Sequence, residues 1–247
     1  LVGSEMCIRD SDITAAGHAL SGKDSVRIAD GTFILTAEKD GIHAENADDT
    51  SLGFVYLADG TFDITSDGDG ISAGNWLQAD GGVYTVKAGG GSENVQKSDG
   101  EWQFGPGQQT ESTDTTEEDT VSMKAIKAAG ELILKGGKYS LDSADDTIHS
   151  NANITISDGE FTLASGDDGI HADSATTISG GTIDITESYE GIEGLSIDIT
   201  GGETYVSGPT NDGNSALDYN GTGTVTGGIF IAAGSSGMAE NFGDSST

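Results

Sequence analysis

Hydrophobic and polar residues alternate along this chain in short runs that end at glycines or acidic residues. In GEFTLAS (159–165), for example, Phe161 and Leu163 alternate with Glu160 and Thr162. Alternation with a period of two predicts a β-strand that has one apolar and one polar face. Helix-forming stretches are almost absent, so the pattern predicts a protein built from many short strands.

A six-residue phrase recurs along the chain, and its clearest copies read DTIHSN, DGIHAD and EGIEGL. The first two copies start 22 residues apart, and the last four copies follow one another at the same interval. The third copy starts seven residues later than this spacing predicts, because of an insertion within 45–53. A repeat of this length predicts a solenoid in which each coil packs on its neighbours. The copies start at His18, Asp40, Asp69, Lys124, Asp146, Asp168 and Glu190.

Each repeat contains three strand-like runs, and three short strands rising ~3.3 Å per residue close one coil of a parallel β-helix. We therefore predict an all-β, single-stranded parallel β-helix with about 22 residues per coil. The glycine before each long strand is expected to have a positive φ or to allow close approach of the coils. Apolar columns predicted to form the core are Leu20, Ile42, Ile71, Ile126, Ile148, Ile170 and Ile192; Phe33, Phe62, Tyr139, Phe161 and Ile183; and Ile28, Leu57, Leu134, Ile156, Ile178 and Ile199.

The expected β-helix domain covers residues 12–247 and is truncated at both ends. Residues 1–11 share nothing with the repeat and resemble translated sequencing-adapter read-through, so we expect a non-native leader without a signal peptide. This leader holds the only cysteine, Cys7, which leaves the rest without a disulfide or thiolate site. A stretch at about 89–122 is rich in Gly, Ser, Thr and Glu, lacks periodicity, and is expected to form a flexible excursion.

The chain is strongly acidic: 42 Asp and Glu against 10 Lys and Arg give a formal charge of −32. This charge excludes a nucleic-acid partner, because phosphate contacts need a basic surface, and it disfavours anionic membranes. No run approaches the ~18–20 apolar residues of a membrane-spanning helix, so no membrane insertion is expected. We expect a monomer.

Acidic residues recur at the corner after each long strand, where coils ~4.8 Å apart should stack the carboxylates. Two ionised carboxylates at ~5 Å repel by about 3 kcal/mol at an effective dielectric constant of about 20. Basic residues at the corners, Lys39 and Lys124, are too few to neutralise the column, so we expect bound calcium (Ca²⁺). The alternative is turn chemistry on a solvated edge. The expected ligands are Asp145, Asp146, Asp167, Asp168 and Glu190, with Asp173 as an outer ligand, and a second site of Asp40, Asp67 and Asp69.

A second polar column lies three residues after each acidic corner and contains Lys127, His149 and His171, with His43 earlier and Glu193 later. Alternation with the buried isoleucines places these side chains outward, where they could contact a hydroxyl-rich or anionic polymer. The simpler interpretation is an ordinary exposed strand face. Spacing alone does not make the four histidines a transition-metal site.

Aromatic residues are few, although sugar rings usually pack on them. The candidates for carbohydrate contact are Trp102 and Phe104 in the excursion, Trp76, Tyr189 and Tyr219. Packing under a loop explains them equally well.

The succession DDTIHS, GDDGIHAD and YEGIEG within 127–194 resembles the bacterial carbohydrate-binding domain-containing β-helix family, and the likeness extends over about 12–247. The resemblance implies a right-handed, pectate-lyase-like β-helix that is secreted or lies at the cell surface. It further implies calcium held by the corner acids and binding of cellulose and polygalacturonate.

Three functions remain open: a noncatalytic polysaccharide binder, which we favour, a pectate-lyase-type enzyme, and an adhesin or spacer with structural calcium. A lyase needs a base beside the acids, usually Arg or Lys. Arg27 lies outside the acidic corners, and Lys39 and Lys127 are the other candidates. A glycosidase pair of carboxylates is harder to exclude, because acids are abundant.

Overall fold

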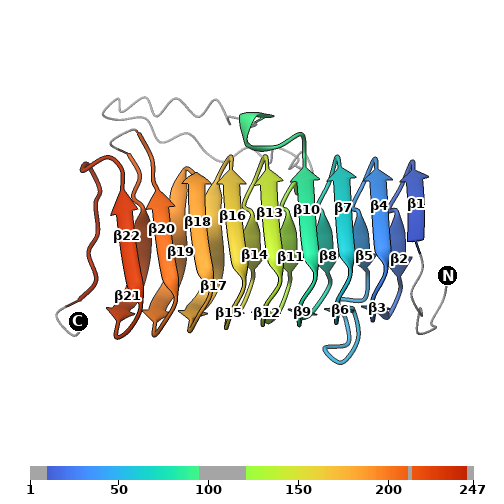
Figure 1. The fold of residues 1–247 in the computed structure, drawn as a ribbon, viewed down its shortest axis with the longest axis horizontal. Helices are drawn as coiled ribbons and strands as arrows, with labels where there is room; N and C mark the ends of the chain where they lie inside the picture. The colour runs from blue at the N-terminus through green and yellow to red at the C-terminus, as the bar shows by residue number, and fades with distance from the viewer. Residues whose placement is uncertain (1–9, 95–120, 211–212, 244–247) are drawn as a thin grey trace, which may run out of the picture.

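Strands at equivalent positions of successive repeats stack in register along a single axis, so that the chain winds into successive coils (Figure 1). The computed structural model describes residues 10–94, 121–210 and 213–243. One sheet, here called the broad face, contains nine parallel strands. Its strands are β1 (Asp10–Ala15), β4 (Thr32–Ala37), β7 (Thr61–Ser66), β10 (Val83–Ala88), β13 (Lys138–Ser143), β16 (Glu160–Ser165), β18 (Thr182–Glu187), β20 (Glu203–Ser207) and β22 (Ile229–Ala233).

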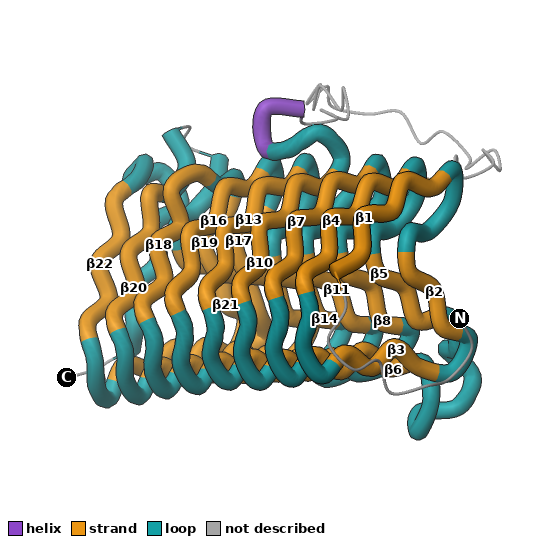
Figure 2. The backbone as a smooth tube through the Cα atoms, turned by 45° about the vertical axis from the view of Figure 1, so that its right-hand side comes forward, coloured by secondary structure: helices purple, strands orange, loops and turns teal. Residues whose placement is uncertain are grey.

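The second sheet has 13 strands and bends to form the two other sides of the tube (Figure 2). The narrow face contains β2 (Leu20–Gly22), β5 (Ile42–Ala44), β8 (Ile71–Ala73), β11 (Ile126–Ala128) and β14 (Ile148–Ser150). The third face contains β3 (Ser25–Ile28), β6 (Phe54–Leu57), β9 (Leu77–Ala79), β12 (Leu132–Leu134) and β15 (Ile154–Ile156). Three longer strands run through both faces: β17 (Asp168–Ile178), β19 (Glu190–Ile199) and β21 (Leu217–Val225).

The predicted parallel β-helix of about 22 residues per coil is confirmed. Equivalent residues pair directly, as Tyr139 does with Phe161 and Ile148 with Ile170, each 22 positions apart. Among the described residues the one helical element is a short 3-10 turn, η1 (Ser92–Asn94). No helix of the described part is long and apolar enough to span a bilayer.

The core lies inside the tube and consists of the predicted apolar columns. Every member is buried except Leu20, which is partly buried in the first coil. Burial of one such side chain contributes roughly 1.5–3 kcal/mol. The aromatic column also contains Tyr84, whose ring stacks 4.9 Å from Phe62 and 4.6 Å from Tyr139. Tyr84 was missing from the predicted column.

From β4 onward, a glycine with a positive φ stands immediately before every broad-face strand, as the repeat predicts. Gly159 has a φ of 128°, and its N–H donates to Asp158 Oδ1 at 2.8 Å. A Cβ at this position would lie 2.8 Å from the Phe161 ring. The glycine therefore allows both the turn and the inward packing of the aromatic column.

In the described part of the chain the first strand begins at Asp10, two residues before the expected domain boundary at 12, and Asp10 pairs with Thr32. The expected excursion at 89–122 falls between β10 and β11. Its central part, which contains Trp102 and Phe104, lies outside the described residues.

Candidate metal and carbohydrate-binding site

The acidic corner joins the broad face to the narrow face, and its carboxylates form the predicted column. Asp168 pairs with Glu190 in the sheet, and the Thr147 N–H donates to the Asp168 carbonyl oxygen at 3.0 Å. Three of these acids are buried: Asp69, Asp146 and Asp168 are only 3%, 2% and 5% exposed. Buried carboxylates need hydrogen-bond partners, which identify the role of each.

One carboxylate oxygen of Asp40, Asp69 and Asp146 accepts a hydrogen bond from the backbone of the next coil. Asp40 Oδ1 accepts from the Asp69 N–H at 3.0 Å, and Asp69 Oδ1 accepts from the Lys124 N–H at 2.9 Å. Asp146 Oδ1 accepts from the Asp168 N–H at 3.1 Å. These bonds connect successive coils outside the sheet ladders.

The other oxygen pairs with a basic side chain three residues later on the narrow face. The Nδ1–Oδ2 distance is 2.7 Å in His43–Asp40, 2.7 Å in His149–Asp146 and 2.9 Å in His171–Asp168. Asp69 has the Lys127 ammonium at 3.7 Å in the equivalent place. Asp40, Asp146 and Asp168 therefore each pair in the same way with the histidine three residues later. We call this arrangement the aspartate–histidine clamp.

Lys124 neutralises the paired acids of the coil that follows it. Its Nζ lies 2.7 Å from Asp145 Oδ2 and 2.9 Å from Asp146 Oδ2. Burial alone would raise the pKa of Asp146, but the His149 hydrogen bond and the Lys124 charge outweigh it and lower the pKa to about 2. The expectation that basic residues are too scarce to neutralise the corner is wrong for these coils, because an ammonium occupies the position expected for a cation.

In the last coils the column consists of acids without a lysine partner among the described residues, and Glu190, Glu193 and Asp218 lie close together. One carboxylate oxygen of each lies within 4.8 Å of the others. Within the described residues their single ion-pair partner is His171, whose Nδ1 lies 2.8 Å from Glu193 Oε2. Burial, followed by the charges of Asp218 and Glu193, raises the pKa of Glu190 to about 7. This all-oxygen group, with too few protein cations, fits a hard cation such as calcium.

Of the predicted metal ligands, Glu190 alone belongs to this group, and sequence reasoning missed Asp218. The phrase ALDYNG (216–221) repeats the apolar–acidic alternation of GIEGLS (191–196), which is the signal for it. The pairing of Glu193 with Asp218 shows the correspondence, 25 residues apart rather than 22.

The remaining predicted ligands are distributed differently. Asp67 is exposed and belongs to none of the potential metal-ligand groups among the described residues. Asp173 Oδ1 contacts His171 Nε2 at 3.3 Å. Asp167 lies with Asp145 and Asp146, where partial desolvation and their charges raise its pKa to about 6.

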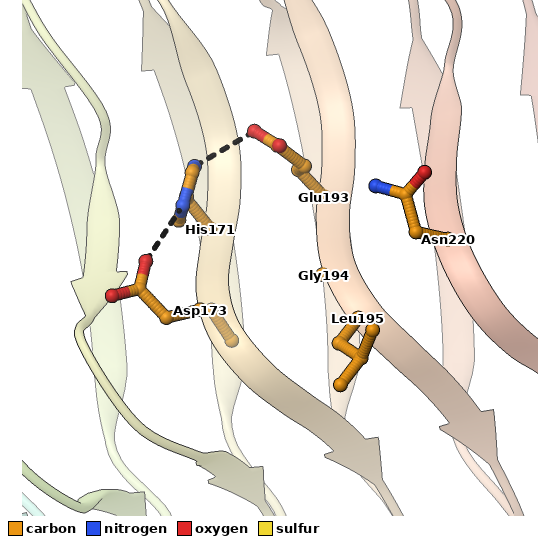
Figure 3. Close-up of a pocket in the computed structure, with 7 residues that line it drawn as sticks. His171, Asp173, Glu193, Gly194, Leu195 and Asn220 are labelled. Atoms are coloured by element: carbon orange, nitrogen blue, oxygen red, sulfur yellow. Dashed lines mark hydrogen bonds and ion pairs between the residues drawn. The ribbon is translucent and has the colours of Figure 1, made fainter.

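A shallow hollow of about 230 Å³ opens beside the acidic group, over β17, β19 and β21 (Figure 3). In this view His171 lies between Asp173 and Glu193, and Asn220 faces Glu193 from the neighbouring strand. The hydrogen bond to Asp168 raises the pKa of His171 to about 9; burial opposes this shift, and the charges of nearby acids add to it. The hollow is lined by His171, Ala172, Asp173, Glu193, Gly194, Leu195 and Asn220.

The predicted carbohydrate contacts divide into three cases. His171 lines the hollow, and its contact with a carbohydrate stays a prediction. His149 is only 9% exposed and its ring stacks on His171 at 4.8 Å, so the expectation of an outward, accessible side chain is wrong for it. Lys127 is partly exposed and donates to Ser122 Oγ at 3.1 Å, while Trp102 lies outside the described residues.

Trp76, Tyr189 and Tyr219 are the aromatic candidates that the structure describes. Trp76 stacks on Phe54 with ring centroids 4.2 Å apart, which covers one face of the indole. Tyr189 is 50% exposed at the corner before β19.

Fold and site together define a parallel β-helix with a polar column on its narrow face and a polar hollow over its last coils. A family model described as carbohydrate-binding domain-containing protein matches residues 6–169, and the chain belongs to this family. The match ends before Glu190, Glu193 and Asp218. No curated protein and no solved structure matches the chain.

Proposed function

We propose that this protein is a noncatalytic polysaccharide binder whose binding surface is the hollow over β17, β19 and β21, with calcium held beside it. The observation that carries the proposal is the hollow itself: polar side chains converge on rigid strands in a member of a carbohydrate-binding family. Sites on regular strands hold their side chains in fixed geometry, which lowers the entropic cost of binding.

The side chains of the hollow match the chemistry of a sugar. Asp173, Glu193 and Asn220 offer acceptors and an amide to hydroxyl groups. Leu195, which is 55% exposed, offers an apolar contact for the C–H face of a sugar ring. The hollow is smaller than the ~300–1,000 Å³ of enclosed small-molecule pockets, so it suits one residue of a polymer lying along the surface.

Calcium would be held by Glu190, Glu193 and Asp218, and Glu193 also lines the hollow. When bound, the ion supplies positive charge and open coordination positions to ligand oxygens at this edge. Sites of this kind in extracellular modules bind calcium at about 10⁻⁴–10⁻³ M, which agrees with a secreted or cell-surface protein.

The proposed ligands are cellulose and polygalacturonate, and the charge of the chain separates them. At −32 the protein repels an anionic polyuronate, so that ligand needs a bridging cation, whereas neutral cellulose does not. Binding of polygalacturonate should therefore depend on calcium much more strongly than binding of cellulose.

The positions of the basic residues favour binding without catalysis. Arg27, the single arginine among the described residues, lies on β3 with its guanidinium 4.9 Å from the Phe54 ring centroid. Lys127 is held between Ser122 and Asp69. Neither is among the residues that line the hollow, where a lyase would place its base.

The test is adsorption to insoluble cellulose and to polygalacturonate, with calcium or with EDTA. We expect Glu193→Gln to weaken adsorption about tenfold, the effect of losing one charged hydrogen bond. Glu187→Gln, an exposed change of the same kind on β18, is the control and should have no effect.

Equal adsorption of the two variants would refute the hollow as the binding surface. Adsorption of polygalacturonate that is unchanged in EDTA would refute the calcium bridge while leaving the cellulose result intact. Appearance of unsaturated, ultraviolet-absorbing product would indicate a lyase, and no adsorption to either polymer would indicate a spacer or adhesin.

A further inference from the structure

We propose that His18, Asp40 and His43 form a binding site for a divalent transition metal, which would tie the first coil to the second. The three residues lie at the amino-terminal end of the narrow face: His18 precedes β2, Asp40 precedes β5 and His43 is the middle residue of β5. Nothing in the polysaccharide proposal uses them, because the hollow lies over β17, β19 and β21.

The ligand atoms already converge on one carboxylate oxygen. Asp40 Oδ2 lies 3.4 Å from His18 Nδ1 and 2.7 Å from His43 Nδ1. The two imidazole rings are stacked, with centroids 4.1 Å apart and planes inclined by 15°. One ligand atom from each of the three residues lies within 4.8 Å of the other two.

These separations are close to those of a tetrahedral zinc site. Zn–N and Zn–O bonds of about 2.0–2.1 Å place neighbouring ligand atoms about 3.3 Å apart. The His18–Asp40 distance of 3.4 Å already meets this value, and the His43–Asp40 distance of 2.7 Å is that of a hydrogen bond. Metal binding would replace that hydrogen bond with a small side-chain shift, and His43 would carry its proton on Nε2.

The protonation of His18 also favours a metal. Its Nδ1 carries a lone pair and not a proton, because it accepts a hydrogen bond from the Asp40 N–H at 3.3 Å; metal binding would replace this long hydrogen bond. Neutral imidazole is the form that binds metal.

The donor set selects the class of metal. Two imidazole nitrogens and one carboxylate oxygen suit zinc, copper or nickel, whereas calcium prefers oxygen ligands throughout. The side chains of His18, Asp40 and His43 are 27%, 15% and 22% exposed, so water can reach a fourth coordination position.

A second histidine pair in the chain provides an internal control. His149 and His171 also stack, and His149 Nδ1 lies 2.7 Å from Asp146 Oδ2. There, however, the Lys124 ammonium lies 2.9 Å from the same oxygen and repels a further cation. No lysine or arginine forms an ion pair with Asp40 among the described residues, so the metal should prefer the amino-terminal pair.

The test uses the full chain without an affinity tag, stripped of metal and titrated with ZnCl₂ by calorimetry in excess calcium. We expect one zinc ion bound by the histidine pair, and Co²⁺ in its place should give the strong visible absorption of a tetrahedral site. His18→Gln and His43→Gln should each weaken zinc binding at least about tenfold, since even the loss of an outer partner of a metal ligand costs that much. His149→Gln, the control, should bind zinc like the wild type.

Hydrogen exchange of the unmodified protein supplies a measurement that needs no variant. Zinc should slow amide exchange in β1, β2 and β5, because within the described residues β1 and β2 each pair with a strand on one side only. The proposal is overturned if the wild type takes up no zinc, if zinc leaves these amides unchanged, or if His149→Gln loses as much affinity as His43→Gln.

Discussion

Replacement of Asp146 by asparagine tests whether the aspartate–histidine clamps stabilise the tube. Asp146 is 2% exposed and contacts Lys124 Nζ, His149 Nδ1 and the Asp168 N–H. The fold lowers its pKa from 3.8 to about 2, and each unit is worth about 1.4 kcal/mol, so the ionised form contributes about 2 kcal/mol. Because Asp146→Asn also leaves two basic groups without their anion, we expect a loss of about 2–4 kcal/mol.

The sign of the pH dependence follows from the lowered pKa. A group whose folded pKa lies below its unfolded value stabilises the fold above the unfolded value, here 3.8. That contribution disappears as the pH falls through about 2. The stability difference between wild type and Asp146→Asn should therefore be constant at neutral pH and shrink between about pH 4 and pH 2.

The assay must resolve individual coils, because solenoids unfold in parts and a single midpoint averages over them. Urea unfolding should be combined with hydrogen exchange of amides in β14 and β17, the strands that flank Asp146. Asp184→Asn removes the same charge from an exposed position on β18 and is the control. A loss within about 0.5 kcal/mol of this control would show that the clamp contributes nothing to stability.

Three further changes test the core, the corners and the acidic group by urea unfolding. Gly159→Ala should cost more than about 1 kcal/mol, because φ is 128° and the new Cβ meets the Phe161 ring; Gly136→Ala, where a Cβ meets nothing closer than 3.4 Å, is the control. Tyr139→Phe should cost about 1 kcal/mol, because the buried hydroxyl donates to the Gly136 carbonyl oxygen at 2.9 Å; a loss near zero would contradict this. Glu190→Gln should stabilise the calcium-free protein by about 1 kcal/mol, because it removes one like charge from the group that Glu190 forms with Glu193 and Asp218; a destabilised variant would argue against repulsion within this group.

The core was predictable because inward positions recur with the repeat. Ile148, Ile170 and Ile192 follow one another at the constant interval, and the sheet pairs them directly. Tyr84 escaped prediction because its coil carries no acidic phrase: β10 is separated from β11 by the long segment around residues 95–120. The recurring acidic phrase is therefore interrupted at this coil, although the alternation in VYTVKA (83–88) still predicts the strand.

The partners of the acidic column were less predictable, because they depend on which way each side chain points and on which neighbouring coil it reaches. The three-residue spacing of Asp146 and His149 is visible in the sequence, but it does not show which oxygen faces the imidazole. Lys124 occupies the position of an acid in its own coil, and its side chain pairs with the acids of the next coil. In a stacked column a side chain can pair with the coil before it or with the coil after it. Side-chain packing, which the sequence does not show, decides which coil it pairs with.

The hollow depends on a feature that the repeat does not contain. The pairing of β17 with β19 shifts register between Ala172 and Ala175, and that of β19 with β21 shifts between Gly194 and Ser196. These irregularities lie at the bend between the narrow and third faces, beside the residues that line the hollow. Bulges of this kind change the direction of side chains and often lie next to functional sites.

The polar column also explains why a binding site would form at one end of a regular tube. In the β-helix the backbone of every coil is nearly the same, so the side chain at each column position decides the local charge. Basic partners balance the acids as far as His171, after which Glu190, Glu193 and Asp218 follow without a lysine or arginine in contact among the described residues. With coils ~4.8 Å apart, the change from neutralised to unneutralised acids takes place over ~10 Å. Acids therefore outnumber their protein cations in the last coils, which is why we propose that a cation or a hydroxyl-rich ligand binds there.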